Sequence, residues 1–202
     1  MQIAIIVGSH RNDSQSSRVG RYVAGDLSRI DPAVSVDTID LAGNPLPLWD
    51  ESIWQGGSDL AAAWKPYRDR LRAADGFVII APEWAGMVPP GLKNFLLFAG
   101  PKEVGHKPAL IVAVSASRGG SYPVNELRTS GYKNSRLLYI PEHVLVQDVA
   151  DVLSGETPAG DRDAWLRRRL EFAERILLEY ARALALIRAS GLTVHADFPY
   201  GM

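Results

Sequence analysis

The amino-acid sequence predicts a three-layer α/β/α sandwich around a five-stranded parallel sheet. Segments with strand character alternate with segments of helical periodicity along the chain, which is the pattern of β-α-β units. Residues 3–7, 76–82 and 108–115 form continuous apolar runs, which are typical of strands covered on both faces. A length of 202 residues suits one such domain, and we expect a single domain over residues 1–202.

The first β-α-β unit occupies the N-terminal part of the chain. A buried strand at 3–7 is followed by a polar loop and by a helix at 18–30, in which apolar residues recur at helical spacing. Asp31 and Pro32 end that helix. Apolar and polar residues then alternate over 34–41, which predicts the second strand and a right-handed crossover.

The middle of the chain continues the alternation after a long loop. Residues 44–57 are rich in proline, glycine and tryptophan and fit neither period, which predicts an ordered loop over the domain edge. Ser58 is a suitable cap for the next helix, whose apolar positions run from Leu60 to Ala74. A strand at 76–82 and a short helix at 91–99 follow, before a glycine-proline stop.

The remaining elements complete the sandwich. We expect a strand at 108–115, a helix around 122–130 and a fifth strand within 136–146. A long final helix is expected from residue 161 to about 189. Its expected role is to pack over a sheet edge, to dock a partner subunit, or both. Its apolar stripe consists of Leu166, Leu170, Ala173, Leu177, Tyr180 and Leu184.

Composition excludes several classes of function. The net charge is −1 and charges of both signs are interspersed, so we expect no binding to nucleic acid or to an anionic membrane. The chain has no cysteine, which excludes disulfides, thiol catalysis and cysteine metal sites. No apolar run approaches the ~18 residues of a membrane span, and no leader pattern is visible, so we expect a cytoplasmic protein. We expect no metal site, because the four histidines are scattered and read as ordinary surface or loop residues: His10, His106, His143 and His195.

The loop after the first strand, "GSHRNDSQSSR" at 8–18, has the chemistry of a phosphate site. Hydroxyl groups, an arginine and the free backbone N–H groups of a helix N-terminus are the donors that a phosphate monoester needs. The sequence lacks both G-x-G-x-x-G and G-x-x-x-x-G-K-[ST], which counts against a dinucleotide-binding dehydrogenase and a P-loop nucleotidase. The alternative interpretation is a solvated turn with a serine cap.

The loop after the third strand, "APEWAGMVPPGLKN" at 81–94, suits a flat heteroaromatic ring. It combines a restrained backbone with apolar side chains at the end of a buried strand. Trp84 and Met87 could equally serve packing alone. Both loops leave the same edge of the predicted sheet, where ligands of α/β proteins bind.

These two loops resemble the motifs of the NADPH-dependent FMN reductase family. The first is similar to the family's G-S-x-R-x-x-S signature, and the second to its P-E-Y-N-x-S-x-P-G-x-L-K-N element. The resemblance extends from residue 1 to about 146. It implies a flavodoxin-like fold with strand order 2-1-3-4-5, and an FMN-dependent oxidoreductase that passes hydride from NADPH or NADH to a flavin, quinone, azo compound or metal oxyanion.

The resemblance also implies the roles of individual residues. The FMN phosphate would be held by Ser9, Arg11, Ser14, Gln15, Ser16 and Ser17. The isoalloxazine ring would lie along Pro82, Glu83, Trp84, Ala85, Gly86 and Met87. A third loop at 115–120 is similar to the family's S-x-x-x-G-G segment at the other edge of the ring, with Ser115, Arg118, Gly119 and Gly120, although it could be a simple glycine-rich turn. No side chain would act as a catalytic group, because the flavin supplies the chemistry.

Four positions depart from the family pattern: Trp84 for tyrosine, Ala85 for asparagine, Met87 for serine and Pro90 for glycine. Contacts to the ring would therefore rest on the backbone amides of 84–87 and 118–120. The family resemblance implies a homodimer or homotetramer, and Trp49 and Trp54 are candidates for that contact or for a wall of the substrate site. A flavodoxin-type electron carrier and a non-enzymatic phospholigand-binding domain remain as alternatives.

Overall fold

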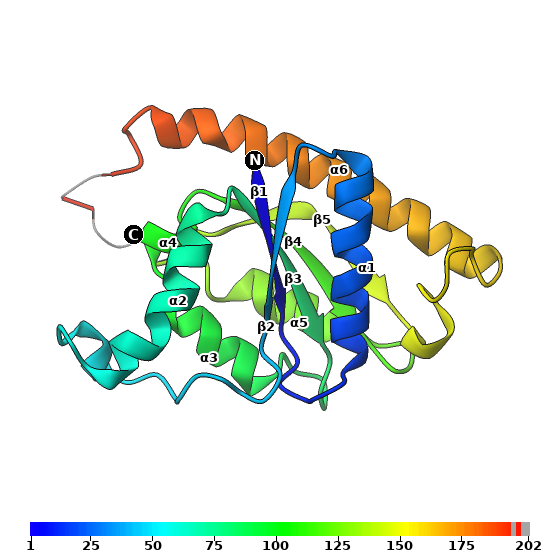
Figure 1. Cartoon of the computed structure of the whole chain (residues 1–202), viewed down its shortest axis with the longest axis horizontal. Coiled ribbons are helices and arrows are strands. Elements are labelled where there is room, and N and C mark those ends of the chain that lie inside the picture. Colours follow the sequence, from blue (N-terminus) through cyan, green and yellow to red (C-terminus); the bar gives the residue numbers. More distant parts are fainter. Residues whose placement is uncertain (195–196, 199–202) are drawn as a thin grey trace.

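A computed structural model gives the fold of the chain and describes residues 1–194 and 197–198. Five strands form one parallel sheet in the order β2-β1-β3-β4-β5, which confirms the predicted fold class and strand order (Figure 1). The strands are β1 (Gln2–Val7), β2 (Ser35–Asp40), β3 (Gly76–Pro82), β4 (Pro108–Val114) and β5 (Leu138–Val146). Because β1, β3 and β4 are neighbours in the sheet, the three loops singled out in the sequence leave it side by side.

Helices cover both faces of the sheet (Figure 1). On one face, α1 (Gln15–Ile30) and α6 (Asp161–Ala189) pack against Ile5, Val78 and Val112 in one apolar core. The other core holds the helices of the opposite face, which are α2 (Asp59–Ala73), α3 (Pro90–Phe98), α4 (Pro101–Val104) and α5 (Ser121–Thr129). Most strand residues of β1, β3 and β4 are fully buried, as their continuous apolar sequences predict.

The first helix begins earlier than its apolar periodicity indicates. The Ser14 side chain accepts a hydrogen bond from the backbone N–H of Ser17 and caps a helix that starts at Gln15, three residues before the predicted start. Polar residues of a first turn carry no apolar signal, so their helical conformation could not be read from periodicity. The cap places the backbone N–H groups of Gln15 and Ser16 at the end of β1.

Three short elements were not predicted. The long loop contains a 3₁₀ turn at Glu51–Trp54, capped by the Asp50 side chain, which accepts from the N–H of Ser52. Pro101, read as the end of a helix, begins α4 instead. A second 3₁₀ turn, Val149–Asp151, follows β5.

The predicted apolar stripe of α6 is wrong at one position. Tyr180 is 37% exposed, whereas Ala181 is 1% exposed and takes the buried place after Leu177. Positions 180 and 181 lie three and four residues after Leu177, so both suit helical spacing, and only packing decides that Ala181 is the buried one.

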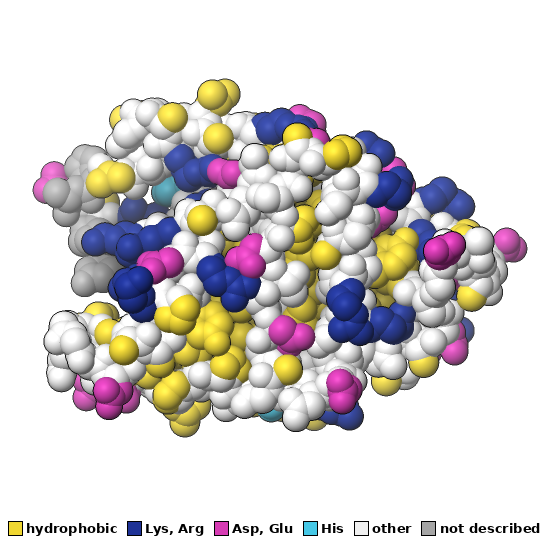
Figure 2. Space-filling model, viewed as in Figure 1, with side chains coloured by type: hydrophobic (Ala, Val, Ile, Leu, Met, Phe, Trp, Pro, Cys, Tyr) yellow, Lys and Arg dark blue, Asp and Glu magenta, His cyan; other side chains and the backbone are white. Residues whose placement is uncertain are grey.

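The surface agrees with the interspersed charge pattern of the sequence. Figure 2 shows Lys and Arg side chains mixed with Asp and Glu over the face that it presents, with hydrophobic side chains between them. Among the described residues, no helix is both long and apolar enough to cross a membrane. The expectation for His195 lies outside the described residues.

Candidate functional site

A cleft of about 280 Å³ lies at the carboxyl ends of β1, β3 and β4. Residues from the first two loops meet there, as their positions after neighbouring strands predict. The lining residues are Ser9, Arg11, Asp13, Ser14, Gln15, Ser16, Pro82, Glu83, Trp84, Val114, Ala116 and Val149. The polar first loop therefore faces an indole ring across a shared opening.

The phosphate-type donors gather at the start of α1. Ser9 and Ser16 are almost fully buried, at 1% and 2% exposure, so their positions are fixed by packing. The backbone N–H of Arg11 donates to Ser9 Oγ over 3.3 Å, which shapes the turn. Within the described part of the chain, the Arg11 guanidinium has neither a carboxylate nor a carbonyl partner. A free guanidinium beside a helix N-terminus is suited to bind an anion.

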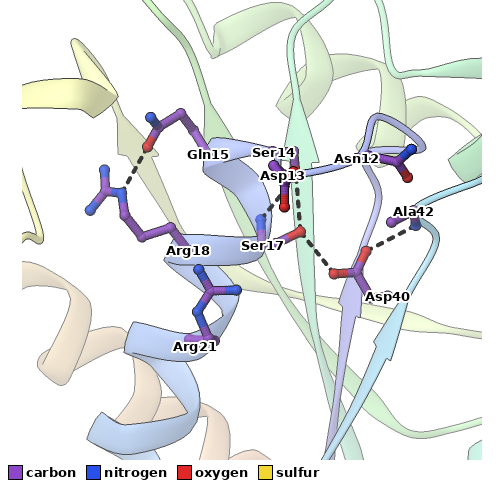
Figure 3. Close-up of a pocket in the computed structure, with 9 residues that line it drawn as sticks. All are labelled: Asn12, Asp13, Ser14, Gln15, Ser17, Arg18, Arg21, Asp40 and Ala42. Atoms are coloured by element: carbon purple, nitrogen blue, oxygen red, sulfur yellow. Dashed lines mark hydrogen bonds between the residues drawn. The ribbon is translucent and has the colours of Figure 1, made fainter.

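Ser14 and Ser17 serve another purpose. Ser17 Oγ donates to Asp40 Oδ2 over 2.8 Å, and because that uses its single proton, Ser14 Oγ must be the donor in the 3.0 Å contact between the two hydroxyls. Figure 3 shows this chain of hydrogen bonds ending at Asp40, on the last residue of β2. The Ser14 proton is thus directed away from the cleft, and Ser14 acts as the helix cap.

Ser17 was predicted to bind phosphate, but it does not line the cleft that Ser9 and Arg11 share with Trp84. It lines a neighbouring cavity of about 500 Å³, together with Arg21, Asp40 and Ala42 (Figure 3). Ser17 lies one residue beyond Ser16 on a helix, which turns its side chain by about 100° away from the cleft. Asp13, Ser14 and Gln15 border both cavities.

The second loop is a tight two-residue turn. Backbone hydrogen bonds join the N–H of Trp84 to the carbonyl of Met87 over 3.0 Å and the N–H of Met87 to the carbonyl of Trp84 over 2.9 Å. Ala85 and Gly86 occupy the tip, with φ of 50° and 76°. Two of the four amides expected to contact a ring are therefore already bonded to the turn itself. The side chain of Met87 is more than half exposed and lies outside the cleft.

Ala85 is strained in this turn, and Ala85→Asn should relieve the strain. An alanine in the left-handed region is disfavoured, whereas asparagine adopts it readily. We expect Ala85→Asn to raise the free energy of unfolding by about 1 kcal/mol. Urea denaturation of the cofactor-free protein would measure this. Ala33→Asn, at an exposed alanine outside the left-handed region, is the control and should give no gain.

Glu83 joins the second loop to the third. Its carboxylate Oε2 accepts a 2.5 Å hydrogen bond from the N–H of Gly120, which has a φ of 110°. A Cβ on Gly119 would lie 2.7 Å from the other carboxylate oxygen, so a larger residue there would displace the Glu83 carboxylate. Glu83 lines the cleft, but its carboxylate is occupied in holding the glycine turn.

The third loop does not form a wall of the cleft in the way predicted. Ser115 Oγ accepts hydrogen bonds from the N–H groups of Ser117 and Gly119, both over 3.2 Å, so Ser115 shapes the loop. The Arg118 side chain is 83% exposed and lies 3.7 Å from Asp148. Three amides of this loop were expected to face a ring. Those of Gly119 and Gly120 donate to Ser115 Oγ and Glu83 Oε2, and only that of Arg118 has no described protein acceptor.

A fourth contributor, the segment after β5, was not predicted. Arg18 donates to the carbonyls of Val152 and Leu153, over 2.9 and 2.8 Å, and also to that of Val149. Burial is the main cause that lowers the pKa of the Arg18 guanidinium below its ordinary value, and the charge of Arg21 adds to it. This clamp brings Val149 into the cleft. Because the end of β5 was not fixed by sequence, the position of its exit loop could not be predicted.

His10 was expected to be an ordinary surface or loop residue; it lies half-buried in the first loop, where its ring makes a specific aromatic contact. Its ring meets the Trp84 indole edge to face, with centroids 4.6 Å apart and planes at 75°. Its Nδ1 is buried without a hydrogen-bond partner among the described residues. The pair formed because the residue after Ser9 faces the second loop, a tertiary contact that no local pattern encodes.

Trp49 and Trp54 do not reach the cleft. Their rings pack against each other with centroids 5.3 Å apart, and they line a separate groove with Leu96 and Leu97 of α3. The backbone N–H of Trp49 donates to Asn94 Oδ1 over 2.8 Å, which ties the long loop to α3. They are therefore not a wall of the predicted cofactor site.

The donors at the cleft fit FMN. Ser9, Arg11 and the amides of Gln15 and Ser16 suit a phosphate dianion, while Pro82 and Trp84 offer apolar surface to a ring. One cleft thus contains the two chemistries that a flavin mononucleotide requires, at opposite ends.

Comparison with known proteins agrees with this geometry. The family model described as NADPH-dependent FMN reductase matches residues 1–151. A probable NADPH:quinone oxidoreductase 1 from Oryza sativa subsp. japonica is 33% identical over 133 residues, which cover 65% of this chain and 66% of that protein. An NADPH azoreductase from Bacillus sp. (strain OY1-2) is 29% identical over 160 residues, which cover 77% of this chain and 82% of that protein. The matched region is just under two thirds of the rice protein.

Solved structures agree in fold. An oxidoreductase from Corynebacterium diphtheriae superposes with a TM-score of 0.68 at 19% identity, covering 90% of this chain and 97% of that one. The flavoenzyme NAD(P)H:(acceptor) oxidoreductase FerB from Paracoccus denitrificans superposes with a TM-score of 0.66 at 18% sequence identity. The match covers 91% of this chain and 97% of FerB. The family model covers most of the chain, including all five strands and every residue of the cleft. The chain belongs to the NADPH-dependent FMN reductase family.

Proposed function

We propose that the protein is an FMN-dependent NAD(P)H oxidoreductase that reduces a small molecule. The observation that carries the proposal is the meeting of the anion donors of the first loop with Trp84 and Pro82 in one cleft. FMN, when bound, accepts a hydride from NADPH or NADH and passes two electrons to the acceptor. The acceptor class, which could be a flavin, quinone, azo compound or metal oxyanion, is for experiment to identify.

The residues of the cleft would divide the work of binding. Ser9, Arg11 and the N–H groups of Gln15 and Ser16 would hold the phosphate, because they combine a fixed cation with free donors. The ring would extend from Trp84 past the turn tip, where the N–H groups of Ala85 and Gly86 have no described protein acceptor. One protein wall would leave the other ring face open to a nicotinamide.

An absorption spectrum followed by an anaerobic titration tests this function. We expect purified protein reconstituted with FMN to show a flavin spectrum that NADPH or NADH bleaches, and a quinone to restore it. Bound flavin that neither nucleotide reduces would indicate an electron carrier. Protein that takes up no FMN would indicate a phospholigand-binding domain and would contradict the proposal.

Arg11→Ala should weaken the binding of FMN by about 1.5–3 kcal/mol, the range of a lost charge-assisted hydrogen bond. Isothermal titration of the cofactor-free protein would measure it. Arg168→Ala, at an exposed arginine of α6 that does not line the cleft, is the matched control. A loss below a few tenths of a kcal/mol would mean that Arg11 does not contact the phosphate.

We also propose that the protein is cytoplasmic and assembles as a homodimer or homotetramer. Support for assembly comes from large apolar side chains beside the groove of Trp49, among which Leu48, Trp54 and Leu97 are 79%, 76% and 65% exposed. Sedimentation of Trp54→Glu against the unaltered protein would test this, since a charge in a buried interface favours the monomer.

A further inference from the structure

We propose that His10 is a positioning residue that fixes the Trp84 indole at the wall of the cofactor cleft. The inference rests on the proposed function for its consequence in catalysis. The contact itself, however, belongs to the protein alone and is tested without cofactor.

Trp84 depends on His10 for the orientation of its ring. Among the described residues, the indole of Trp84 makes its aromatic contact with His10. The indole N–H donates no hydrogen bond to another described residue. The backbone hydrogen bonds with Met87 fix where the side chain starts, but not how the ring is turned. An edge-to-face contact of this kind is directional, so it selects one ring orientation.

His10 is itself held by its surroundings on three sides. The N–H of Gly43 donates to the His10 carbonyl over 3.2 Å, which fixes the backbone. A Cβ on Gly91 would lie 2.8 Å from His10 Nδ1 and 3.3 Å from the side-chain oxygen of Asn44. The imidazole therefore occupies the space that the missing side chain of Gly91 leaves at the start of α3.

The unpaired Nδ1 shows that no hydrogen bond from this atom to a described residue holds the ring. A buried nitrogen without a partner costs free energy that an apolar side chain of similar size would avoid. What the imidazole supplies is an aromatic edge aimed at Trp84. A ligand ring that stacks beside the indole would then meet a Trp84 ring whose plane has one fixed orientation.

A double-mutant cycle between His10→Ala and Gly91→Ala tests the proposal. Gly91→Ala displaces the imidazole without touching Trp84, whereas in the His10→Ala background the added methyl group meets no imidazole. The first readout is the tryptophan emission of the cofactor-free protein, with Trp84→Phe used to isolate the signal of Trp84. We expect each single variant to shift this emission and the double variant to match His10→Ala. His10→Phe keeps an aromatic edge and should restore most of the original signal.

The second readout uses FMN-loaded protein with two acceptors as probes. 1,4-Benzoquinone must approach the ring closely, whereas ferricyanide accepts electrons without stacking. We expect His10→Ala and Gly91→Ala to raise KM for benzoquinone about three- to tenfold, the change that matches one ring contact, and to raise KM for ferricyanide by a smaller factor.

Two results would overturn the inference: an unchanged Trp84 emission in His10→Ala, or additive effects of the two substitutions. Failure of the proposed function is distinguishable, because a protein that binds no FMN would still give the emission result.

Discussion

Glu174→Gln should raise the free energy of unfolding at pH 8 by about 1–3 kcal/mol, the cost of leaving a buried polar group without a partner. Glu174 of α6 is fully buried at the contact with α1, and its nearest polar neighbour is Asp26, which is 7% exposed. As two carboxylates, neither Glu174 oxygen nor Asp26 Oδ2 has a donor. Burial, and then the hydrogen bond and charge of Asp26, raise the pKa of Glu174 well above its ordinary value. A glutamine N–H would donate to Asp26 without carrying a charge.

The sign of the effect depends on pH. At about pH 4 the carboxyl group is protonated in both states, so the two proteins should differ little. Above that, the unfolded chain releases its proton while the folded chain keeps it, and the native protein loses stability until the folded pKa is passed. Glutamine does not titrate, so the advantage of the variant should grow between pH 5 and pH 8.

Urea denaturation at those two pH values measures the difference. Glu171→Gln is the control, since Glu171 lies one turn away on the same helix, is partly exposed and pairs with Arg29 and Arg175. That variant should gain nothing. An advantage of Glu174→Gln that is equal at both pH values would contradict the assignment of a raised pKa.

This pair of acids illustrates what local pattern does not reveal. The periodicity of α6 correctly marks Leu170, Ala173 and Leu177 as buried, but it reads Glu174 as a polar position. Burial of an acid is decided by the neighbouring helix, so it follows from tertiary packing. The same limit explains Tyr180, because positions 180 and 181 both suit helical spacing from Leu177 and packing alone buries Ala181.

At the cleft, too, the sequence predicts the chemistry of the residues but not the tertiary contacts that orient them. The anion chemistry of Ser9, Arg11 and Ser16 could be predicted, because it depends on residue type and on place after a buried strand. The direction of each side chain could not be predicted, and Ser17 points toward Asp40 and a neighbouring cavity. Backbone amides at 84–87 and 118–120 were expected to be free, but the carbonyls of the 84–87 turn, the Ser115 hydroxyl and the Glu83 carboxylate accept hydrogen bonds from four of them.

Gly8→Ala should destabilise the protein by about 1–3 kcal/mol, because the added methyl group has no space. Gly8 ends β1 and starts the first loop, and its N–H donates to the Ile80 carbonyl over 2.8 Å. A Cβ there would lie 2.8 Å from that same carbonyl oxygen and 2.5 Å from Cδ2 of Leu92, which is fully buried. The leucine side chain could rotate, but a carbonyl inside the sheet cannot move without breaking the ladder.

The strain should also reach the cleft, since the chain after Gly8 carries Ser9 and Arg11. If the first loop moves to relieve the clash, the affinity for FMN falls by about tenfold, equivalent to about 1.4 kcal/mol. Gly25→Ala is the matched control, because its Cβ would meet nothing within 4 Å on the exposed face of α1. Alanine should stabilise that helix by about 0.5–1 kcal/mol and leave FMN binding unchanged.

Urea denaturation and FMN titration of both variants separate packing from binding. Loss of stability with unchanged affinity would mean that Leu92 and the sheet absorb the strain and that the loop holds its shape. Loss of both stability and affinity would mean that the positions of the phosphate donors depend on the close approach of β1 and β3. A Gly8→Ala protein as stable as the native one would contradict the packing argument, because the added methyl group would lie 2.8 Å from the Ile80 carbonyl oxygen.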